Sequence, residues 1–111
     1  MPTIEGVTAN VHGSKTVSGA TSTTIDASNS GSSFFFSPTV LTGKAGQKLT
    51  ITVKNTGTVP HTFTLADGSV DKTFQPGQSA KVSVTFPATG SLAFFCKFHK
   101  TSGMVGELTS A

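Results

Sequence analysis

Two segments of strictly alternating polar and apolar residues constrain the fold of this chain more than any other feature. The apolar positions of the first segment, residues 48–54, are Leu49, Ile51 and Val53. Those of the second segment, residues 80–86, are Ala80, Val82, Val84 and Phe86. Because side chains on an extended strand point alternately to its two faces, both segments predict β-strands with one face in a core and one in water.

Further short strands with turns between them extend this pattern. Residues 61–65 alternate again, with His61 in phase with the core side chains Phe63 and Leu65. Residues 92–96 place Cys96 on the inward face, and residues 105–109 form a short closing strand. Gly or Pro occurs in the intervening sequences NTG at 55–57, QPGQ at 75–78 and PATG at 87–90. Short strands at this spacing predict an all-β sandwich of two mainly antiparallel sheets.

Length and composition agree with a single domain of this kind. The chain has 111 residues, of which 35% are hydrophobic and 12% charged, and we assign residues 1–111 to one domain. The segment 14–33 is rich in Ser, Thr and Gly, and we expect an edge strand at 21–27 rather than a linker. The run from Phe34 to Phe36 is interpreted as core, and His12 as a surface imidazole.

Charge and cysteine content exclude several function classes. The net charge is +3, but the eight cations are scattered along the sequence, whereas nucleic-acid-binding proteins usually cluster them. We therefore expect no nucleic-acid partner. A single Cys excludes an internal disulfide. The N-terminal sequence MPTI lacks the basic and apolar regions of a signal peptide.

The residues that carry chemistry gather around the only Cys. The sequence Cys96-x2-His99-x4-Met104 offers a thiolate, an imidazole and a thioether in one loop, and His61 adds a second imidazole from a distant strand. Two nitrogens and one strong sulfur, with a weak sulfur on the axis, form the ligand set of a blue-copper electron-transfer site. This set leaves little to rearrange when copper changes its oxidation state.

This loop, with a preceding Pro60-His61, resembles the cupredoxins that have a plastocyanin-type ligand loop. Other segments of the same resemblance are FSP at 36–38, AGQ at 45–47, VKNTG at 53–57 and HTF at 61–63. The resemblance implies a Greek-key β-sandwich that holds one type 1 copper ion near one end. It also implies His61, Cys96 and His99 as equatorial ligands and Met104 as the long axial ligand.

The same resemblance implies a one-electron carrier, not an enzyme, that works outside the cytoplasm in the periplasm or at the cell surface. His99 would be the electron port, in an apolar patch to which Pro60, Phe98, Met104 and Val105 contribute. Lys97 and Lys100 flank this patch, so we expect redox partner proteins with an acidic docking face. We expect a monomer and no small-molecule substrate.

One position departs from the family pattern. Many cupredoxins follow the first ligand His with Asn or Ser, whose side chain ties the two ligand-bearing loops together. Here the residue is Thr62, whose hydroxyl has less reach than an Asn amide and offers one donor.

Other functions use the same residues less completely. A Cys–His hydrolase would pair a thiol with a base but leaves Met104 without a role. A structural zinc site would include a thioether, which is a poor zinc ligand. A copper carrier or store without an electron-transfer role would use the same metal. A multicopper oxidase or nitrite reductase needs further ligands, and the chain has only three His.

Overall fold

The computed structural model describes residues 3–31 and 33–110. Within these residues the chain forms twelve β-strands and one short 3-10 helix, η1 (Lys100–Ser102). No helix in this part of the chain is long and apolar enough to cross a membrane. Both ends of the predicted domain 1–111, and Ser32 within the predicted 14–33 segment, lie outside the described residues.

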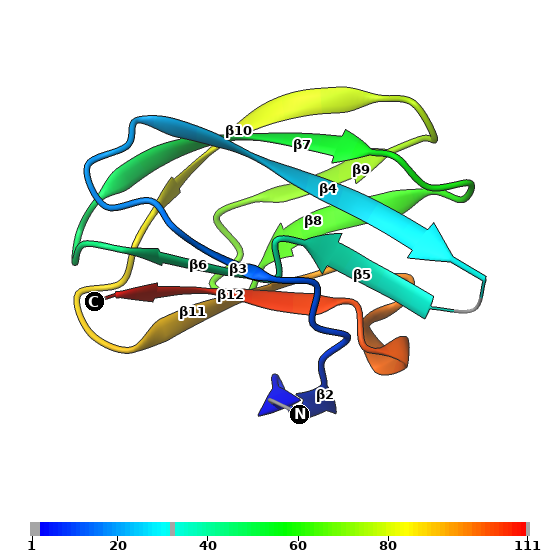
Figure 1. Cartoon of the computed structure of the whole chain (residues 1–111), viewed down its shortest axis with the longest axis horizontal. Helices are drawn as coiled ribbons and strands as arrows, with labels where there is room; N and C mark the ends of the chain where they lie inside the picture. The colour runs from blue at the N-terminus through cyan, green and yellow to red at the C-terminus, as the bar shows by residue number, and fades with distance from the viewer. Residues whose placement is uncertain (1–2, 32, 111) are drawn as a thin grey trace.

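Two sheets packed face to face form the body of the fold (Figure 1). The four-stranded sheet has the order β10 (Ser79–Thr85), β7 (Lys48–Asn55), β4 (Ser22–Ser30) and β5 (Ser33–Ser37). The six-stranded sheet has the order β3 (Ser14–Thr16), β6 (Val40–Gly43), β12 (Val105–Ser110), β11 (Ser91–Phe95), β8 (His61–Leu65) and β9 (Asp71–Phe74). This arrangement confirms the predicted Greek-key β-sandwich.

The alternating segments form the strands that their pattern predicts. β7 and β10 pair antiparallel with Ile51 opposite Val82, and the inward side chains of both strands are buried, except Ala80, which is partly buried. Phe36, Phe63 and Phe94 meet between the sheets, and Phe36 makes edge-to-face contacts with the other two rings. The core is therefore built from both sheets and extends to the end where Cys96 lies.

The position of one strand differs from the sequence-based prediction. Residues 22–30 form β4, as the Thr-rich composition of this segment suggests, but β4 lies between β7 and β5 instead of at an edge. Its pairing with β7 is parallel, and β6 is parallel to both β3 and β12, while the other strand pairs are antiparallel. Parallel partners come from distant parts of a chain, so local alternation does not reveal them.

The prediction that residues 34–36 all lie in the core is wrong for Phe35. Phe36 is fully buried and Phe34 is partly buried and packs against the core, whereas Phe35 is partly exposed and is not part of it. Successive side chains on β5 point to opposite faces, so Phe35 faces outward and stacks on the ring of His12 at a centroid distance of 3.5 Å. His12 is exposed, as predicted.

A hairpin near the N-terminus, β1 (Thr3–Ile4) and β2 (Val7–Thr8), packs outside the sandwich. It lies below β12 and near η1 in Figure 1. Ile4 and Ala9 form a second apolar cluster with Val105, with Phe95 packed against it. This cluster covers the outer side of the strands that flank the loop from Cys96 to Met104.

Candidate metal centre

Three of the predicted ligands meet at one end of the sandwich. His61 begins β8, Cys96 follows β11, and His99 precedes η1. Their ligand atoms all lie within 4.8 Å of one another. Cys96 Sγ is 3.9 Å from His61 Nδ1 and 3.5 Å from His99 Nδ1. His61 and Cys96 are fully buried, and His99 is partly exposed.

Strand pairing explains why Cys96 lies beside His61. β11 and β8 are antiparallel neighbours, with Phe95 opposite Thr64, so the residue after β11 continues toward Thr62. The Thr62 N–H donates to Cys96 Sγ at 3.3 Å, and the Lys97 N–H donates to Thr62 Oγ1 at 2.8 Å. Thr62 therefore joins the two ligand-bearing segments directly, despite the shorter reach of its hydroxyl.

The loop from Cys96 to Met104 is closed by its own backbone hydrogen bonds. The His99 N–H donates to Cys96 O at 3.2 Å, the Met104 N–H to His99 O at 3.2 Å, and the Cys96 N–H to Met104 O at 3.1 Å. Gly103 turns the chain with a φ of 96°, a conformation that favours glycine. Met104 is fully buried in the same apolar cluster as Cys96. Its backbone hydrogen bonds place it beside both Cys96 and His99.

Asn29 on β4 orients the His61 ring, a role that the sequence did not indicate. The backbone N–H of Thr58 donates to Asn29 Oδ1 at 2.9 Å, which assigns this atom as an acceptor. His61 Nε2 lies 3.3 Å from the same oxygen, so Nε2 carries the proton and Nδ1 presents its lone pair toward Cys96. A Cβ added at Gly57 would overlap the Asn29 side chain and lie 2.9 Å from His61 Nε2, so glycine is needed here.

Phe34 and Asn10 support the other side of the site, and sequence reasoning missed both roles. The Phe34 ring stacks on His99 with a centroid distance of 3.9 Å and an interplanar angle of 6°. The Asn10 amide donates to Phe34 O at 2.9 Å and to Ser102 O at 2.8 Å, and its backbone N–H donates to Gly103 O at 3.0 Å. Asn10 thus links the segment after the N-terminal hairpin to the ligand loop and to the residue that stacks on His99.

Both histidines of the site are neutral at pH 7. Burial and, to a smaller extent, the neighbouring His99 together lower the pKa of His61 to about 4. Burial also lowers the pKa of His99. Neutral imidazoles have the free lone pairs that a metal ion requires.

The lowered pKa of His61 makes the metal-free fold sensitive to acid. Between pH 6.5 and pH 4 the unfolded chain binds a proton at His61 that the folded chain does not, so stability falls as the pH falls. We expect the free energy of unfolding of the metal-free protein to decrease by about 2 to 3 kcal/mol between pH 7.5 and pH 4.5. Denaturant titrations at several pH values measure this change.

Two variants isolate the contribution of His61 to that pH dependence. His61→Gln should reduce it and leave the smaller dependence that comes from His99, whereas His12→Gln, a change at an exposed ring, is the matched control. A hydrogen bond from Lys97 lowers the pKa of Asp71, and hydrogen bonds from Ser69 lower the pKa of Asp67, both from the usual value of 3.8. These two carboxylates therefore stay charged between pH 4.5 and pH 7.5. An equal dependence in wild type and His61→Gln would contradict the assignment to His61.

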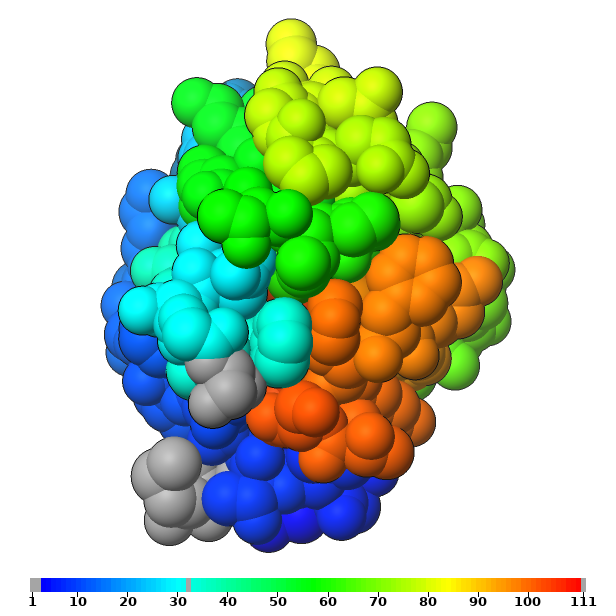
Figure 2. Space-filling model, turned by 90° about the vertical axis from the view of Figure 1, so that its right-hand side faces the viewer, coloured from blue at the N-terminus to red at the C-terminus, as the bar shows by residue number. Residues whose placement is uncertain are grey.

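The surface at this end differs in part from the predicted apolar patch. Phe98 is 57% exposed and Pro60 is exposed, but Met104 and Val105 are fully buried and contribute nothing to the surface. Figure 2 views this end of the molecule, where the loop around residue 98 lies between segments from three other parts of the chain. The exposed patch therefore consists of Pro60, Phe98 and the accessible part of His99.

The two lysines of the ligand loop are paired with acidic residues that lie far away in the sequence. Lys97 Nζ lies 2.8 Å from Asp71 Oδ2, and Lys100 Nζ lies 3.6 Å from Glu5 Oε1. Lys100 also lies over the Phe95 ring, 4.4 Å from its centroid. Each positive charge thus has a negative charge beside it, and the excess charge expected from the loop sequence is locally compensated.

The chemistry of the converging side chains fits copper better than the alternatives. Imidazole and thiolate together suit copper, and the two histidine Nδ1 atoms and Cys96 Sγ converge without a large rearrangement. Cys96 is fully buried, and this burial disfavours the hydrolase alternative, which needs a sulfur that a substrate can reach.

Comparisons with known proteins agree with this geometry. Residues 6–109 match the model of the cupredoxin-like domain family. The chain is 34% identical over 84 residues to plastocyanin A/B of Petroselinum crispum, covering 67% of this chain and 84% of that protein.

Solved structures show the same likeness. The dithionite-reduced auracyanin of the photosynthetic bacterium Roseiflexus castenholzii is 27% identical, with a TM-score of 0.64 over 83% of this chain and 99% of that one. A copper-containing nitrite reductase of Thermus scotoductus has a TM-score of 0.65 at 15% identity over 82% of this chain and 31% of that one. The likeness to the reductase concerns the fold alone.

Proposed function

Because this chain belongs to the cupredoxin-like family, we propose that it is a type 1 copper protein that carries one electron at a time between redox partners. Its family and its histidine, cysteine and methionine set support a single copper ion as cofactor. The observation that carries the proposal is the buried convergence of His61, Cys96 and His99 from three separate segments.

In this proposal the protein holds its ligands in one geometry for both oxidation states. Copper bound there would cycle between Cu(II) and Cu(I). Asn29 holds the tautomer of His61, and Phe34 restricts the plane of His99. The Thr62 N–H donates to Cys96 Sγ and stabilises negative charge on this sulfur. Because these partners lie on strands, the side chains need to move little when an electron arrives.

Spectroscopy and voltammetry on the copper-loaded protein test this function. A type 1 site gives an intense thiolate-to-copper absorption in the visible range and a reversible one-electron wave. A copper store would instead release its metal readily to a chelator and would exchange electrons slowly. A colourless Cu(II) complex would remove the type 1 assignment, and a coloured protein without a reversible wave would favour the store.

Met104 is the proposed axial ligand, and two substitutions test it. Met104→Leu should keep the colour and raise the reduction potential, because loss of a weak sulfur donor destabilises Cu(II) more than Cu(I). Met104→Gln should lower the potential, since an amide oxygen favours Cu(II). Voltammetry measures both shifts. If neither variant changes the potential, Met104 only packs beside the site.

We propose that electrons enter and leave through the exposed part of His99, with Pro60 and Phe98 contacting the partner. The acidic docking face expected from Lys97 and Lys100 is a weaker candidate, because both charges are paired. The rate of electron exchange with an anionic reagent should therefore change less than threefold between roughly 0.02 and 0.15 M salt. A steep decrease of this rate with increasing salt would instead support a partner with an acidic docking face.

We propose that the protein is located outside the cytoplasm, in the periplasm or at the cell surface, on the basis of its family resemblance. Fractionation of cells that express the full-length gene product, followed by detection of the protein in each fraction, tests this proposal. Recovery from the cytoplasmic fraction alone would contradict it.

A further inference from the structure

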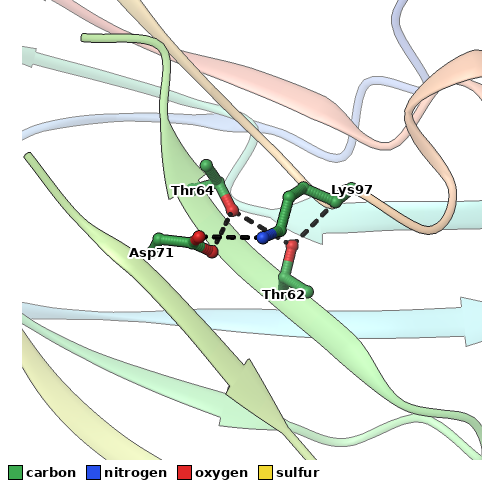
Figure 3. Close-up of polar contacts among 4 residues, drawn as sticks. All are labelled: Thr62, Thr64, Asp71 and Lys97. Carbon is green, nitrogen blue, oxygen red and sulfur yellow. Dashed lines mark hydrogen bonds and ion pairs between the residues drawn. The ribbon is translucent and has the colours of Figure 1, made fainter. Parts of the chain in front are cut away.

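A chain of polar contacts runs from the ligand loop to the surface beside β9 (Figure 3). The Lys97 N–H donates to Thr62 Oγ1 at 2.8 Å, and Thr62 Oγ1 lies 3.2 Å from Thr64 Oγ1. Thr64 Oγ1 donates to Asp71 Oδ1 at 3.1 Å, and Lys97 Nζ donates to Asp71 Oδ2 at 2.8 Å. The contacts form a closed ring that begins and ends at Lys97, the residue after Cys96.

The direction of each hydrogen bond follows from the donors available. The Asp71 carboxylate only accepts, so the hydroxyl proton of Thr64 points to it. Thr64 Oγ1 can then only accept from Thr62, whose hydroxyl proton therefore points away from the Lys97 N–H. Thr62 presents a lone pair to that N–H as a result. Asp71 thus determines the orientation of a hydroxyl that it does not touch.

Burial makes this orientation consequential. Thr62 is fully buried and Thr64 is nearly so, at 0% and 7% exposure, whereas the side chains of Asp71 and Lys97 are about half exposed, at 49% and 48%. An ion pair at the surface contributes little by itself, but buried hydroxyls without a fixed partner are costly. The two buried hydroxyls therefore contribute more to holding the ring together than the Asp71–Lys97 ion pair does.

We propose that Asp71 is a positioning residue for the copper site, acting through Thr64 and Thr62 to hold the Cys96–Lys97 backbone against β8. The same backbone of β8 supplies the Thr62 N–H that donates to Cys96 Sγ, so the ring keeps the sulfur and its donor in register. This inference rests on the copper site proposed above. It assigns Asp71 and Thr64 a part in tuning that site, although neither is a ligand.

Four variants separate the contributions of the ring. Asp71→Ala removes both acceptor oxygens, whereas Asp71→Asn keeps one oxygen for Thr64 and loses the charge. Thr64→Val removes the hydroxyl at nearly constant volume. Asp67→Ala is the matched control, because Asp67 is an acidic residue whose side chain, within residues 3–31 and 33–110, accepts hydrogen bonds from Ser69 in its own turn and takes no part in the ring.

Amide hydrogen exchange in the metal-free protein is the first measurement. In Thr64→Val and Asp71→Ala we expect the Lys97 N–H to exchange about tenfold faster than in wild type, which corresponds to the loss of one buried hydrogen bond. Asp71→Asn should change the rate less, and Asp67→Ala should leave it unchanged. Wild-type exchange at Lys97 in both Thr64→Val and Asp71→Ala would overturn the proposal.

The reduction potential and visible spectrum of the copper-loaded variants are the second measurement, because a purely structural role would not move them. Thr64→Val and Asp71→Ala should each change the reduction potential and the visible spectrum, and the sign of each change should be the same in the two variants. Asp71→Asn should produce smaller changes, and Asp67→Ala should produce none. A wild-type potential and spectrum in the first two variants would overturn the role of Asp71. A wild-type protein without the visible band would instead overturn the copper function, while the exchange rates would still report on the ring.

Discussion

Cys96→Ser should abolish the intense visible absorption of the oxidised, copper-loaded protein, even where the variant still binds copper. The absorption arises from a bond between copper and a thiolate, and Cys96 is the only sulfur of this kind in the chain. His61 and His99 remain in place, so a colourless or weakly coloured Cu(II) complex is the expected product. Visible spectroscopy at equal copper content, measured by metal analysis, compares the two proteins.

His12→Gln is the control for this substitution. It removes an imidazole that is exposed and stacked on Phe35, away from the three converging ligands, so its spectrum should equal that of wild type. A surviving intense band in Cys96→Ser would falsify the assignment of Cys96 as the strong ligand.

Phe36→Ala should cost about 3 to 5 kcal/mol of folding stability, in the metal-free and copper-loaded protein alike. The Phe36 ring is fully buried between the sheets and contacts the rings of Phe63 and Phe94 at centroid distances of 6.0 and 5.0 Å. Its removal leaves a cavity in the apolar core that both sheets form. Denaturant unfolding of both forms measures the change.

The same experiment tests how far the fold depends on copper. Copper should add stability to an already folded chain, by about 2.7 kcal/mol at a free concentration one hundred times its dissociation constant. Phe98→Ala is the control, since its ring is 57% exposed and its loss should change stability by about 0.5 kcal/mol or less. A metal-free wild type without a cooperative unfolding transition would show that the core is insufficient by itself.

Local sequence patterns predicted the strands and three converging candidate ligands. Alternation over 48–54 and 80–86 indicated β7 and β10 and their inward residues, because the period of two is a property of any extended chain. The phase of His61 within its strand and the spacing from Cys96 to His99 likewise indicated side chains that could meet. The resemblance to cupredoxins added Met104 as a ligand, and its role as an axial ligand stays a prediction.

Only the tertiary structure decided which strands are neighbours and which residues support the ligands. The parallel pairing placed β4 inside its sheet, and with it Asn29 beside His61, 32 residues away in the sequence. The antiparallel pairing of β9 with β8 places Asp71 near Lys97, 26 residues away in the sequence. The pairing of that lysine removes the local excess charge that the loop sequence implied. Such contacts depend on how whole strands pack against each other, so no short pattern in the sequence encodes them. The metal ligands were recognisable because their spacing is largely local, whereas the partners that orient them come from segments that only the packed sandwich brings together.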